Sequence, residues 1–205
     1  MATVLLARHA ESTWNRQGRL QGWAPTELTD RGRDQAAALA ARLAARSPDR
    51  LLSSDLERTV ETAEIVASET ALDPALDRAW RERDYGFLQG LPADEAFERF
   101  PRLSPANDEA APDERPEGGE SIRTFTDRVT QGWDRLVAGL APDETVVVVT
   151  HNGVLGVVLA HVEDRPLAER YETAAHPNCA VTEVSVRDAG TATVREAATD
   201  HLSPD

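Results

Sequence analysis

Short apolar runs alternate with amphipathic segments along the 205-residue chain. Runs of four to eight apolar residues bounded by polar or turn-forming residues are typical of buried strands. The run TVVVVT at residues 145–150 has four consecutive valines, which indicates a central strand covered on both faces. Strands are therefore expected over residues 3–7, 50–53, 145–150, 180–186 and 192–197, with a turn at Asp188-Ala189-Gly190 before the last of them.

Apolar residues at helical spacing predict three longer helices. The first begins at Thr29-Asp30-Arg31-Gly32, the second is capped by Ser54-Asp55 and runs to about Ser68, and the third begins at Ser121. A short helix is expected near Asp94–Phe100. The expected core residues of the three longer helices are, in chain order, Ala36, Leu39, Ala40 and Leu43; Val60, Ala63, Ile65 and Ala67; Ile122, Phe125, Val129, Trp133 and Leu136.

The alternation of strands and helices predicts an α/β fold with a mostly parallel sheet. No internal repeat or interdomain linker is visible, so a single domain over residues 1–205 is expected. The segment 92–120 differs from the rest, because it is rich in proline and glycine and has nine acidic residues against three arginines between residues 94 and 120. A loop of this length inside a compact domain is usually functional, which predicts a lid or insertion here.

All 22 basic side chains are arginine, and the net charge is −14. The absence of lysine excludes a Walker A phosphate loop and a lysine Schiff base. Nucleic acid is not an expected partner, because 36 carboxylates would repel its phosphates. The acidic, lysine-free composition fits either adaptation to high salt or a GC-rich genome that favours arginine codons.

No apolar stretch approaches the ~20 residues of a membrane span, and no secretory signal precedes the first strand. Cys179 is the only cysteine, so an intrachain disulfide is excluded. These features predict a cytoplasmic protein that does not bind membranes. They leave open whether the protein forms a homodimer.

Polar residues whose side chains could bind a ligand or take part in catalysis follow three of the expected strands. Arg8-His9 ends the first strand, Ser53-Ser54-Asp55 leads to Arg58 after the second, and His151-Asn152-Gly153 follows the valine strand. If these strands are parallel, their carboxyl ends meet at one edge of the sheet. Two arginines, two histidines and nearby helix N-termini would then form an anion site suited to a phosphoryl group.

Six stretches in the expected order resemble the histidine phosphatase superfamily, also called the phosphoglycerate mutase-like family. They are ARHAESTWNRQGRLQGW, ELTDRGRDQA, LLSSDLERTVETAEIVA, WRERDYGFLQG, PEGGES and VVVVTHNGVL, and together they cover about residues 3–160. The resemblance implies a three-layer sandwich with helices on both faces of a mostly parallel sheet and a helical or loop lid.

The resemblance also implies roles for individual residues. His9 would be the nucleophile that accepts the phosphoryl group, Glu82 the proton donor to the leaving oxygen, and Arg8, Arg58 and His151 the groups that bind phosphoryl oxygens. Asn15, with Gln21 and Gly22, would complete the cradle, and Thr13, Tyr85 and Asn152 are further candidates for substrate contact. No cofactor or metal is expected, since one cysteine and histidines without ligand spacing do not make a metal site.

Several residues have a structural interpretation instead. His161, His176 and His201 match no motif and are expected to be structural or exposed, and Cys179 is expected to be a small buried hydrophobe. Ala10 stands where the family usually has glycine, and we expect its methyl group to be accommodated.

Three functions remain open. A phosphomonoesterase that acts on a small phosphorylated metabolite through phospho-His9 is favoured. A phosphoglycerate mutase is the alternative, although mutases of the family carry a lysine shortly after the Glu82 motif, where this chain has Ala93, and a paired-arginine insertion before the PEGGES-like region. The third hypothesis is a module that binds a phosphorylated ligand with weak activity.

Overall fold

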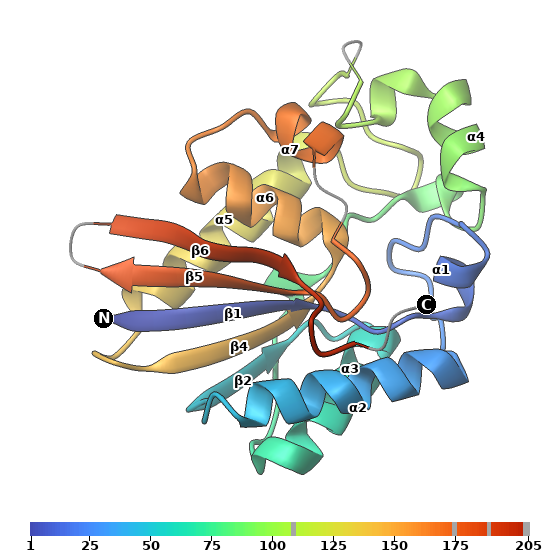
Figure 1. Ribbon diagram of the computed structural model, residues 1–205. Coiled ribbons are helices and arrows are strands. Elements are labelled where there is room, and N and C mark those ends of the chain that lie inside the picture. The colour runs from blue at the N-terminus through green and yellow to red at the C-terminus, as the bar shows by residue number, and fades with distance from the viewer. Residues whose placement is uncertain (108–109, 174–175, 188–189, 203–205) are drawn as a thin grey trace.

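The computed structural model describes residues 1–107, 110–173, 176–187 and 190–202, and shows a sheet between two layers of helices (Figure 1). The strands of the sheet are β1 (Ala2–Arg8), β2 (Arg50–Ser53), β3 (Ala75–Leu76), β4 (Thr145–Thr150), β5 (Val181–Arg187) and β6 (Gly190–Ala198). The α-helices are α1 (Thr13–Arg16), α2 (Asp30–Ala44), α3 (Glu57–Thr70), α4 (Ala93–Arg99), α5 (Ile122–Ala138), α6 (Asn152–Val162) and α7 (Leu167–Thr173). Three short 3-10 turns are η1 (Arg78–Trp80), η2 (Gly86–Leu88) and η3 (Pro101–Leu103).

The strand order in the sheet is β3-β2-β4-β1-β5-β6. Neighbours among β1, β2, β3 and β4 are parallel, whereas β5 pairs antiparallel with β1 and with β6. The predicted α/β class with a mostly parallel sheet is therefore confirmed, and all five predicted strands are present. Asp188 and Ala189 of the expected turn lie outside the described residues.

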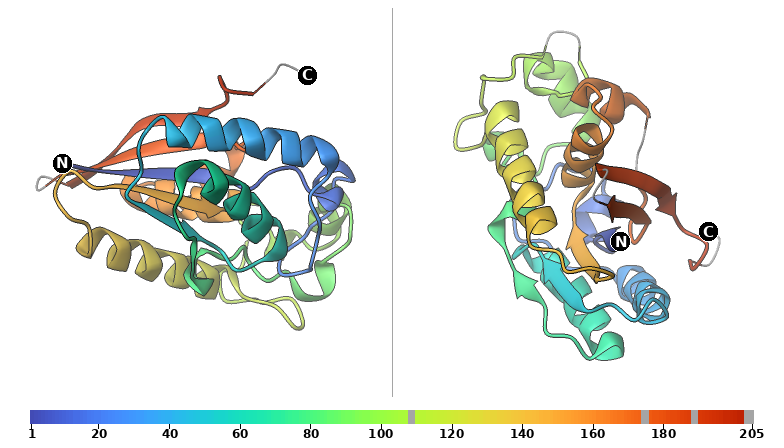
Figure 2. Two further views of the ribbon diagram at one scale, coloured as in Figure 1. Left: turned by 90° about the horizontal axis from the view of Figure 1, so that it is seen from below. Right: turned by 90° about the vertical axis from the view of Figure 1, so that its left-hand side faces the viewer.

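The valines of β4 divide between the two faces of the sheet, because side chains alternate along a strand. Val146 and Val148 pack in one cluster with apolar residues of α5 and α6, and Val147 and Val149 pack in another with residues of α2 and α3. Figure 2 shows these two helical layers on opposite sides of the sheet. This double burial explains why the run lacks alternating polar residues, as a central strand requires.

The helices begin largely where the sequence predicts. Thr29 caps α2 and Ser121 caps α5, each with its side chain accepting an N–H of the first turn. All predicted core residues of these two helices are buried. The stripe thus fixes which face of each helix packs on the sheet.

The predicted cap of α3 is wrong. The helix begins at Glu57 after Leu56, which makes no side-chain cap, because Ser54 and Asp55 have partners elsewhere. The predicted core positions are also only partly right: Ala63 is buried, but Val60, Ile65 and Ala67 are half-buried, and Thr59, Thr62 and Val66 are buried instead. The helix therefore presents a more polar face to the interior than its apolar residues suggest.

Within segment 92–120, the expected short helix is present as α4, followed by η3. Ala96 of α4 and Leu103 of η3 are buried and pack with Leu20, Tyr85 and Leu88. This apolar cluster is separate from the two on the sheet. Figure 1 shows α4 beyond the end of the sheet at which β1 ends. The segment therefore lies near the carboxyl ends of the parallel strands, where ligands bind in such folds.

Candidate active site

His9 follows directly after β1, and its backbone N–H donates to the carbonyl of Thr150 at 2.8 Å, which joins the ends of β1 and β4. The imidazole is 3% exposed. Its Nδ1 lies 2.7 Å from the carbonyl oxygen of Ala10, a group that can only accept, so Nδ1 carries the hydrogen. The opposite nitrogen, Nε2, therefore presents a lone pair.

Arg58 stands in the first turn of α3 and is 1% exposed. Its Nε donates to Nε2 of His9 at 3.3 Å, and its Nη2 donates to the carbonyl of Gly22 at 2.8 Å. The same Nη2 lies 3.1 Å from Nδ1 of His151. The guanidinium of Arg58 thus joins the two histidines to the loop that follows α1. These contacts fix the orientation of the guanidinium.

His151 is fully buried at the residue that precedes α6. Because its Nδ1 faces the N–H of Arg58, the hydrogen is on Nε2, which lies 3.0 Å from the hydroxyl of Ser54. The rings of His9 and His151 are 5.2 Å apart between centroids and inclined at 60°. The carboxyl ends of β1, β2 and β4 thereby converge on one pair of imidazoles.

Burial and positive charge keep both imidazoles neutral. Burial, followed by the charges of Arg58 and Arg8, lowers the pKa of His9 well below its ordinary value of 6.5. Burial and Arg58 lower the pKa of His151 in the same way. Burial also lowers the pKa of Arg58 to about 10, so this guanidinium still carries its charge at neutral pH. The site therefore combines neutral nitrogen bases with fixed cations.

Arg8 is the last residue of β1, and its Nη1 donates to the carbonyl of His176. Its Nε is buried and has no hydrogen-bond partner within the described part of the chain. A buried donor without a partner is rare in folded proteins and calls for an acceptor. Since Arg8 adjoins His9, an anion bound at the imidazole could supply that acceptor.

Glu82 lies in the extended segment after η1 and is 9% exposed. Its Oε1 accepts the backbone N–H of Arg83 at 2.9 Å, and its Oε2 accepts the N–H of Gly153, in the first turn of α6, at 3.1 Å. Its negative charge raises the pKa values of Arg8 and Arg58 against the effect of burial. The carboxyl group therefore lies near both guanidiniums, and backbone donors orient it.

Gly153 gives this carboxyl its space. A Cβ atom at position 153 would lie 2.1 Å from Oε1 of Glu82, far inside any real contact distance. The glycine therefore lets the helix backbone approach the acid closely, as its missing side chain permits.

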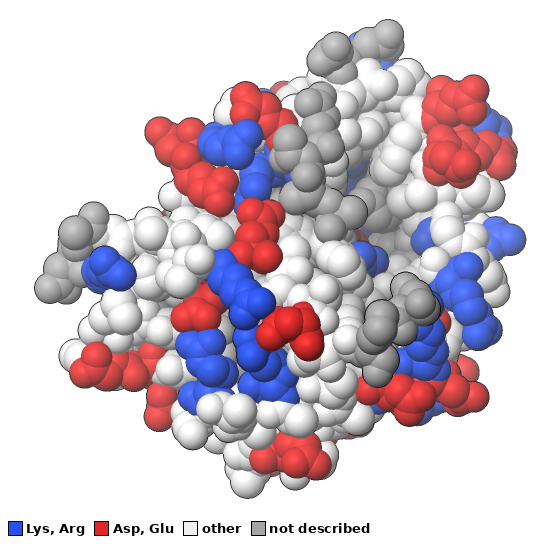
Figure 3. Space-filling view, viewed as in Figure 1, with Lys and Arg blue, Asp and Glu red and all other residues white. Residues whose placement is uncertain are grey.

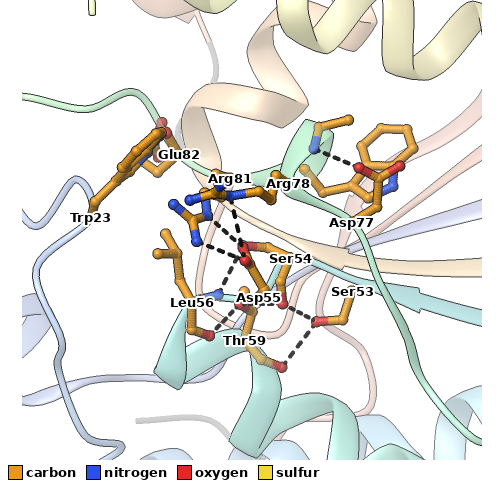
Figure 4. A network of polar contacts seen from close by, with 12 residues as sticks. Trp23, Ser53, Ser54, Asp55, Leu56, Thr59, Asp77, Arg78, Arg81 and Glu82 are labelled. Atoms are coloured by element: carbon orange, nitrogen blue, oxygen red, sulfur yellow. Dashed lines mark hydrogen bonds and ion pairs between the residues drawn. The ribbon is translucent and has the colours of Figure 1, made fainter. Parts of the chain in front are cut away.

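Arg81, next to Glu82, lies between an acid and an aromatic ring (Figure 4). Its Nε and Nη2 donate to the two carboxylate oxygens of Asp55 at 2.5 and 2.6 Å, and its guanidinium carbon is 4.5 Å from the ring centre of Trp23. The indole N–H of Trp23 donates to the carbonyl of Glu82 at 2.8 Å. The segment that contains Arg81 and Glu82 is thus held to the segment before α3 and to the loop after α1.

Arg128 of α5 holds the same segment from the other side. Its guanidinium donates to the carbonyls of Arg81 and Glu82 at 2.9 and 3.2 Å and pairs with Glu120 at 2.7 Å. Glu120 also accepts the N–H of Asp84 through a carboxylate oxygen at 3.1 Å. Glu120 is therefore part of this clamp.

The predicted cradle residues are engaged in holding their own loop. Asn15 completes the capping box of α1, whose N-cap is Ser12: its Oδ1 accepts the N–H of Ser12 and an amide hydrogen of Asn178. Gln21 is buried, and its side chain bonds the hydroxyls of Ser12 and Thr26. Gly22 has φ +52°, and its carbonyl receives Arg58. Of these candidates, only Gly22 has a contact with a residue of the imidazole pair or their guanidinium.

The other predicted substrate contacts are less central. Thr13 begins α1 and bonds through its backbone to Glu27. The side-chain oxygen of Asn152 accepts the N–H of His176 at 3.0 Å, so it orients the loop that carries the acceptor of Arg8. Tyr85 is buried in the apolar cluster of segment 92–120, where its ring lies edge-on to Phe97. Burial and the charge of Glu82 raise the pKa of Tyr85, so its hydroxyl is neutral.

Sequence reasoning missed the residues that orient the site from a distance. The loop before β5 supports the first strand, since Asn178 donates to the carbonyl of His9 at 2.9 Å and the N–H of Cys179 donates to that of Arg8 at 3.1 Å. Cys179 is fully buried, as expected. In the sequence, Arg128 stands out only as an arginine within the helix predicted from Ser121, and Gly153 only as a glycine after His-Asn. Neither feature predicts a contact with Glu82, which is 46 residues from Arg128 and 71 from Gly153.

Of the other histidines, His176 is buried, whereas His161 is exposed and bonds Asp134 at 3.0 Å. No group of three or more histidine, cysteine, aspartate or glutamate side chains among the described residues could hold a metal ion. Over the same residues, no helix is both long and apolar enough to cross a membrane.

Comparison with known proteins agrees with this geometry. The family model of the histidine phosphatase superfamily (branch 1) matches residues 4–199, so the chain belongs to that superfamily. Phosphoglycerate mutase-like protein 4 of Arabidopsis thaliana is 37% identical over 174 residues, which cover 83% of this chain and 74% of the relative. A metal-independent phosphoserine phosphatase of the same plant is 35% identical over 189 residues, covering 90% of this chain and 76% of the relative.

Among solved structures, a mycobacterial glucosyl-3-phosphoglycerate phosphatase in complex with VO3 matches with a TM-score of 0.84 and 30% identity, over 96% of this chain and 99% of its own. The superfamily and these relatives identify the protein as an enzyme of the phosphatase or mutase type.

Proposed function

We propose that the protein is a phosphomonoester hydrolase that passes the phosphoryl group of a small phosphorylated metabolite through His9. The observation that carries the proposal is the pairing of a neutral imidazole, whose Nε2 holds a lone pair, with the buried guanidinium of Arg58 at 3.3 Å. A nucleophile with no proton, next to fixed positive charge, suits attack on an anionic phosphorus centre.

In the first step, Nε2 of His9 forms a bond to phosphorus while the bond between phosphorus and the ester oxygen breaks. Glu82, protonated at this stage, gives its proton to the departing oxygen, and the alcohol leaves. Arg58 and the partnerless Nε of Arg8 donate to the phosphoryl oxygens, on which the negative charge is spread. Phosphoryl transfer depends mainly on such alignment and charge stabilisation.

In the second step, the ionised Glu82 takes a proton from a water molecule, whose oxygen attacks the phosphorus of phosphohistidine. The bond from phosphorus to Nε2 breaks, which returns His9 to its neutral form and releases inorganic phosphate. Glu82 is again protonated, so the cycle closes. The two backbone N–H groups on its carboxyl oxygens hold the orientation of Glu82 in both steps.

Arginine side chains supply the charge that a metal ion would otherwise contribute, so we propose a reaction without a metal. Chelation with EDTA should then leave phosphate release unchanged. The segment 92–120 is proposed as the lid that selects the leaving group, since it packs on Tyr85 and Leu88 just beyond Glu82.

A hydrolase is favoured over a mutase because the surface of the proposed lid has the wrong charge for a doubly phosphorylated intermediate. Asp94, Glu95 and Glu98 are exposed on α4, and Figure 3 shows acidic side chains gathered at that corner. These carboxylates would repel a second phosphate group. A mutase must retain that intermediate, which requires additional cationic groups.

A phosphoglycerate mutase is the second candidate, favoured by one observation. Arg83 is 2% exposed, and its buried Nη2 has no partner within the described residues. This third guanidinium could meet a second anionic group of the substrate. A coupled assay with 3-phosphoglycerate and catalytic 2,3-bisphosphoglycerate separates the two functions: isomerisation faster than phosphate release would establish the mutase.

The hydrolase is tested by trapping its intermediate. A 32P-labelled ester quenched within the first turnover should leave an acid-labile label on the wild-type protein and none on His9→Ala, which should also lose phosphate release from an aryl phosphate. Full activity in His9→Ala would overturn the proposal. Tight binding of phosphorylated ligands without turnover by the wild type would instead establish a binding module.

The proton donor has its own test. Glu82→Gln should lower turnover by roughly 10²–10⁴, most strongly for alkyl esters whose alcohols leave poorly. Equal losses for aryl and alkyl esters would remove Glu82 from this role.

A further inference from the structure

The ring of Tyr171, on α7, lies along a face of α6 that lacks side chains. A Cβ atom at Gly156 would be 3.3 Å from Cε2 of Tyr171 and 3.7 Å from its Cζ. One turn earlier, a Cβ atom at Gly153 would be 2.9 Å from the tyrosine hydroxyl. The two glycines therefore form a groove on α6 in which the ring lies, with its hydroxyl toward the N-terminus of the helix. Glycine inside a helix costs roughly 0.5–1 kcal/mol relative to alanine, which this close packing can offset.

The groove ends at the carboxyl group of Glu82. The same absent Cβ of Gly153 that would lie 2.9 Å from the hydroxyl of Tyr171 would lie 2.1 Å from Oε1 of Glu82. Both oxygens thus border one small space at the start of α6. Since Glu82 faces the leaving oxygen in the proposed reaction, Tyr171 lies on the leaving-group side of the site and not on the phosphoryl side.

The hydroxyl of Tyr171 is an unused hydrogen-bond donor. It has no hydrogen-bond partner in the described part of the chain, although the side chain is half-buried. Burial, with the charges of Tyr85 and Glu82, raises the pKa of Tyr171 well above its ordinary value, so the proton stays on the oxygen throughout the neutral range. A protein donor left without a partner next to reacting groups is available to a ligand.

We propose that Tyr171 is a specificity-determining residue whose hydroxyl donates a hydrogen bond to an oxygen of the substrate's alcohol portion close to the ester. The inference rests on the proposed function, because it takes the position of the leaving group from the role of Glu82. It predicts a preference for phosphomonoesters in which the carbon next to the ester carbon carries a hydroxyl oxygen or is itself a carboxylate carbon, over plain alkyl phosphates. A site that offers such a donor disfavours a substrate that cannot use it.

The test compares matched esters in wild type and Tyr171→Phe. Glycerol 1-phosphate is compared with propyl phosphate, and 2-phosphoglycolate with ethyl phosphate, so each pair differs only in polar oxygens near the ester. The variant should lose about 3–10-fold in kcat/KM for glycerol 1-phosphate and about 10–100-fold for 2-phosphoglycolate, since bonds to charged acceptors are stronger. The two alkyl phosphates should change less than about twofold.

Gly156→Ala is the second variant, because it keeps the hydroxyl but moves the ring. A methyl group 3.3 Å from Cε2 forces a shift of a few tenths of an ångström, so the preference for polar esters should fall here too, by less than in Tyr171→Phe. Thermal unfolding of both variants shows whether each remains folded.

Two results would overturn the inference. An equal loss for polar and alkyl esters in Tyr171→Phe would assign the residue to packing alone, and no loss for any ester would show that the hydroxyl does not reach the substrate. Failure of the proposed function is distinguishable, because the wild type would then release no phosphate from any of the four esters and His9 would take no label.

Discussion

Nε of Arg58 lies 3.3 Å from Nε2 of His9, so the arginine points a hydrogen at the lone pair that would attack phosphorus. This contact satisfies two buried polar groups at once. In the proposed reaction, a phosphoryl group that enters the site would draw the N–H onto its own oxygen and so expose the lone pair. Arg58 would thereby couple arrival of the anion to availability of the nucleophile.

Replacement of Arg58 by lysine should lower kcat/KM for an aryl phosphate by roughly 10²–10³, the usual cost of losing an oriented donor at a developing charge. Lysine keeps the charge but cannot contact His9, His151 and the carbonyl of Gly22 together. Steady-state kinetics measure the effect. Arg50→Lys, at an exposed ion pair with Glu144 where β2 begins, is the control and should retain full activity. Equal activity of the two variants would contradict the coupling.

The low pKa values of His9 and His151 predict that the fold loses stability in mild acid. In the unfolded chain both histidines take up protons near pH 6.5, whereas the folded chain resists protonation until lower pH. The two histidines therefore do not lower the free energy of unfolding above pH 6.5. Below pH 6.5 the free energy of unfolding falls as the pH drops, by up to about 1.4 kcal/mol per pH unit for each histidine.

Urea unfolding between pH 7.5 and 5.0 measures this slope. His9→Gln should reduce it, because one group that resists protonation is gone. His161→Gln, which replaces a histidine whose side chain is 41% exposed, is measured alongside as the matched control. A slope in His9→Gln equal to that of the wild type would show that His9 does not stay neutral.

Local patterns predicted much of the fold because the spacing of apolar residues along one segment indicates whether that segment is a strand or a helix. The valine run identified β4, and the stripe from Ile122 to Leu136 identified α5, since each pattern lies within a single segment of the chain. The cap of α3 was mispredicted for the opposite reason. Ser54 and Asp55 are good cap residues, but His151 and Arg81, distant in sequence, bind their side chains.

The site followed the same rule. Residues at the carboxyl ends of parallel strands could be brought together from topology, as with His9, Arg58 and His151. Topology does not predict the direction of a side chain. The amide of Asn152, for example, faces the backbone of His176. Tyr171 lies outside every motif, and only the packing of α7 on α6 brings it to Glu82.

Gly153→Ala should displace Glu82, the proposed proton donor, and leave His9, the proposed nucleophile, in place. The new Cβ would lie 2.1 Å from Oε1 of Glu82, so the carboxyl must move. We expect a loss of about 10²-fold or more in turnover of alkyl phosphates, comparable to that of Glu82→Gln, with a smaller loss for aryl phosphates. Gly139→Ala, where the nearest atom would be 3.5 Å away, is the control. A Gly153→Ala enzyme with normal turnover of alkyl esters would show that the position of Glu82 is not critical.

Asp55 binds Arg81 closely and Arg78 only distantly. Replacing each arginine in turn therefore tests whether the pair of Asp55 with Arg81 holds the segment that contains Glu82. Arg81 binds both carboxylate oxygens and has a side chain only 13% exposed, whereas Arg78 approaches to 3.9 Å and is 73% exposed. Arg81→Lys loses the paired hydrogen bonds and the contact with Trp23, so we expect about 1–3 kcal/mol lower stability and a reduced kcat for alkyl esters.

Arg78→Lys changes the same chemical group at an exposed ion pair, and its stability should stay within about 0.5 kcal/mol of the wild type. Urea unfolding and leaving-group kinetics on both variants separate stability from catalysis. Because Trp23 bonds the carbonyl of Glu82, a shift of Arg81 should reach the acid through the indole, and Trp23→Phe should reproduce the kinetic loss with Asp55 and Arg81 still paired. If Arg81→Lys lowers stability but leaves the leaving-group dependence of kcat unchanged, the network supports the fold alone.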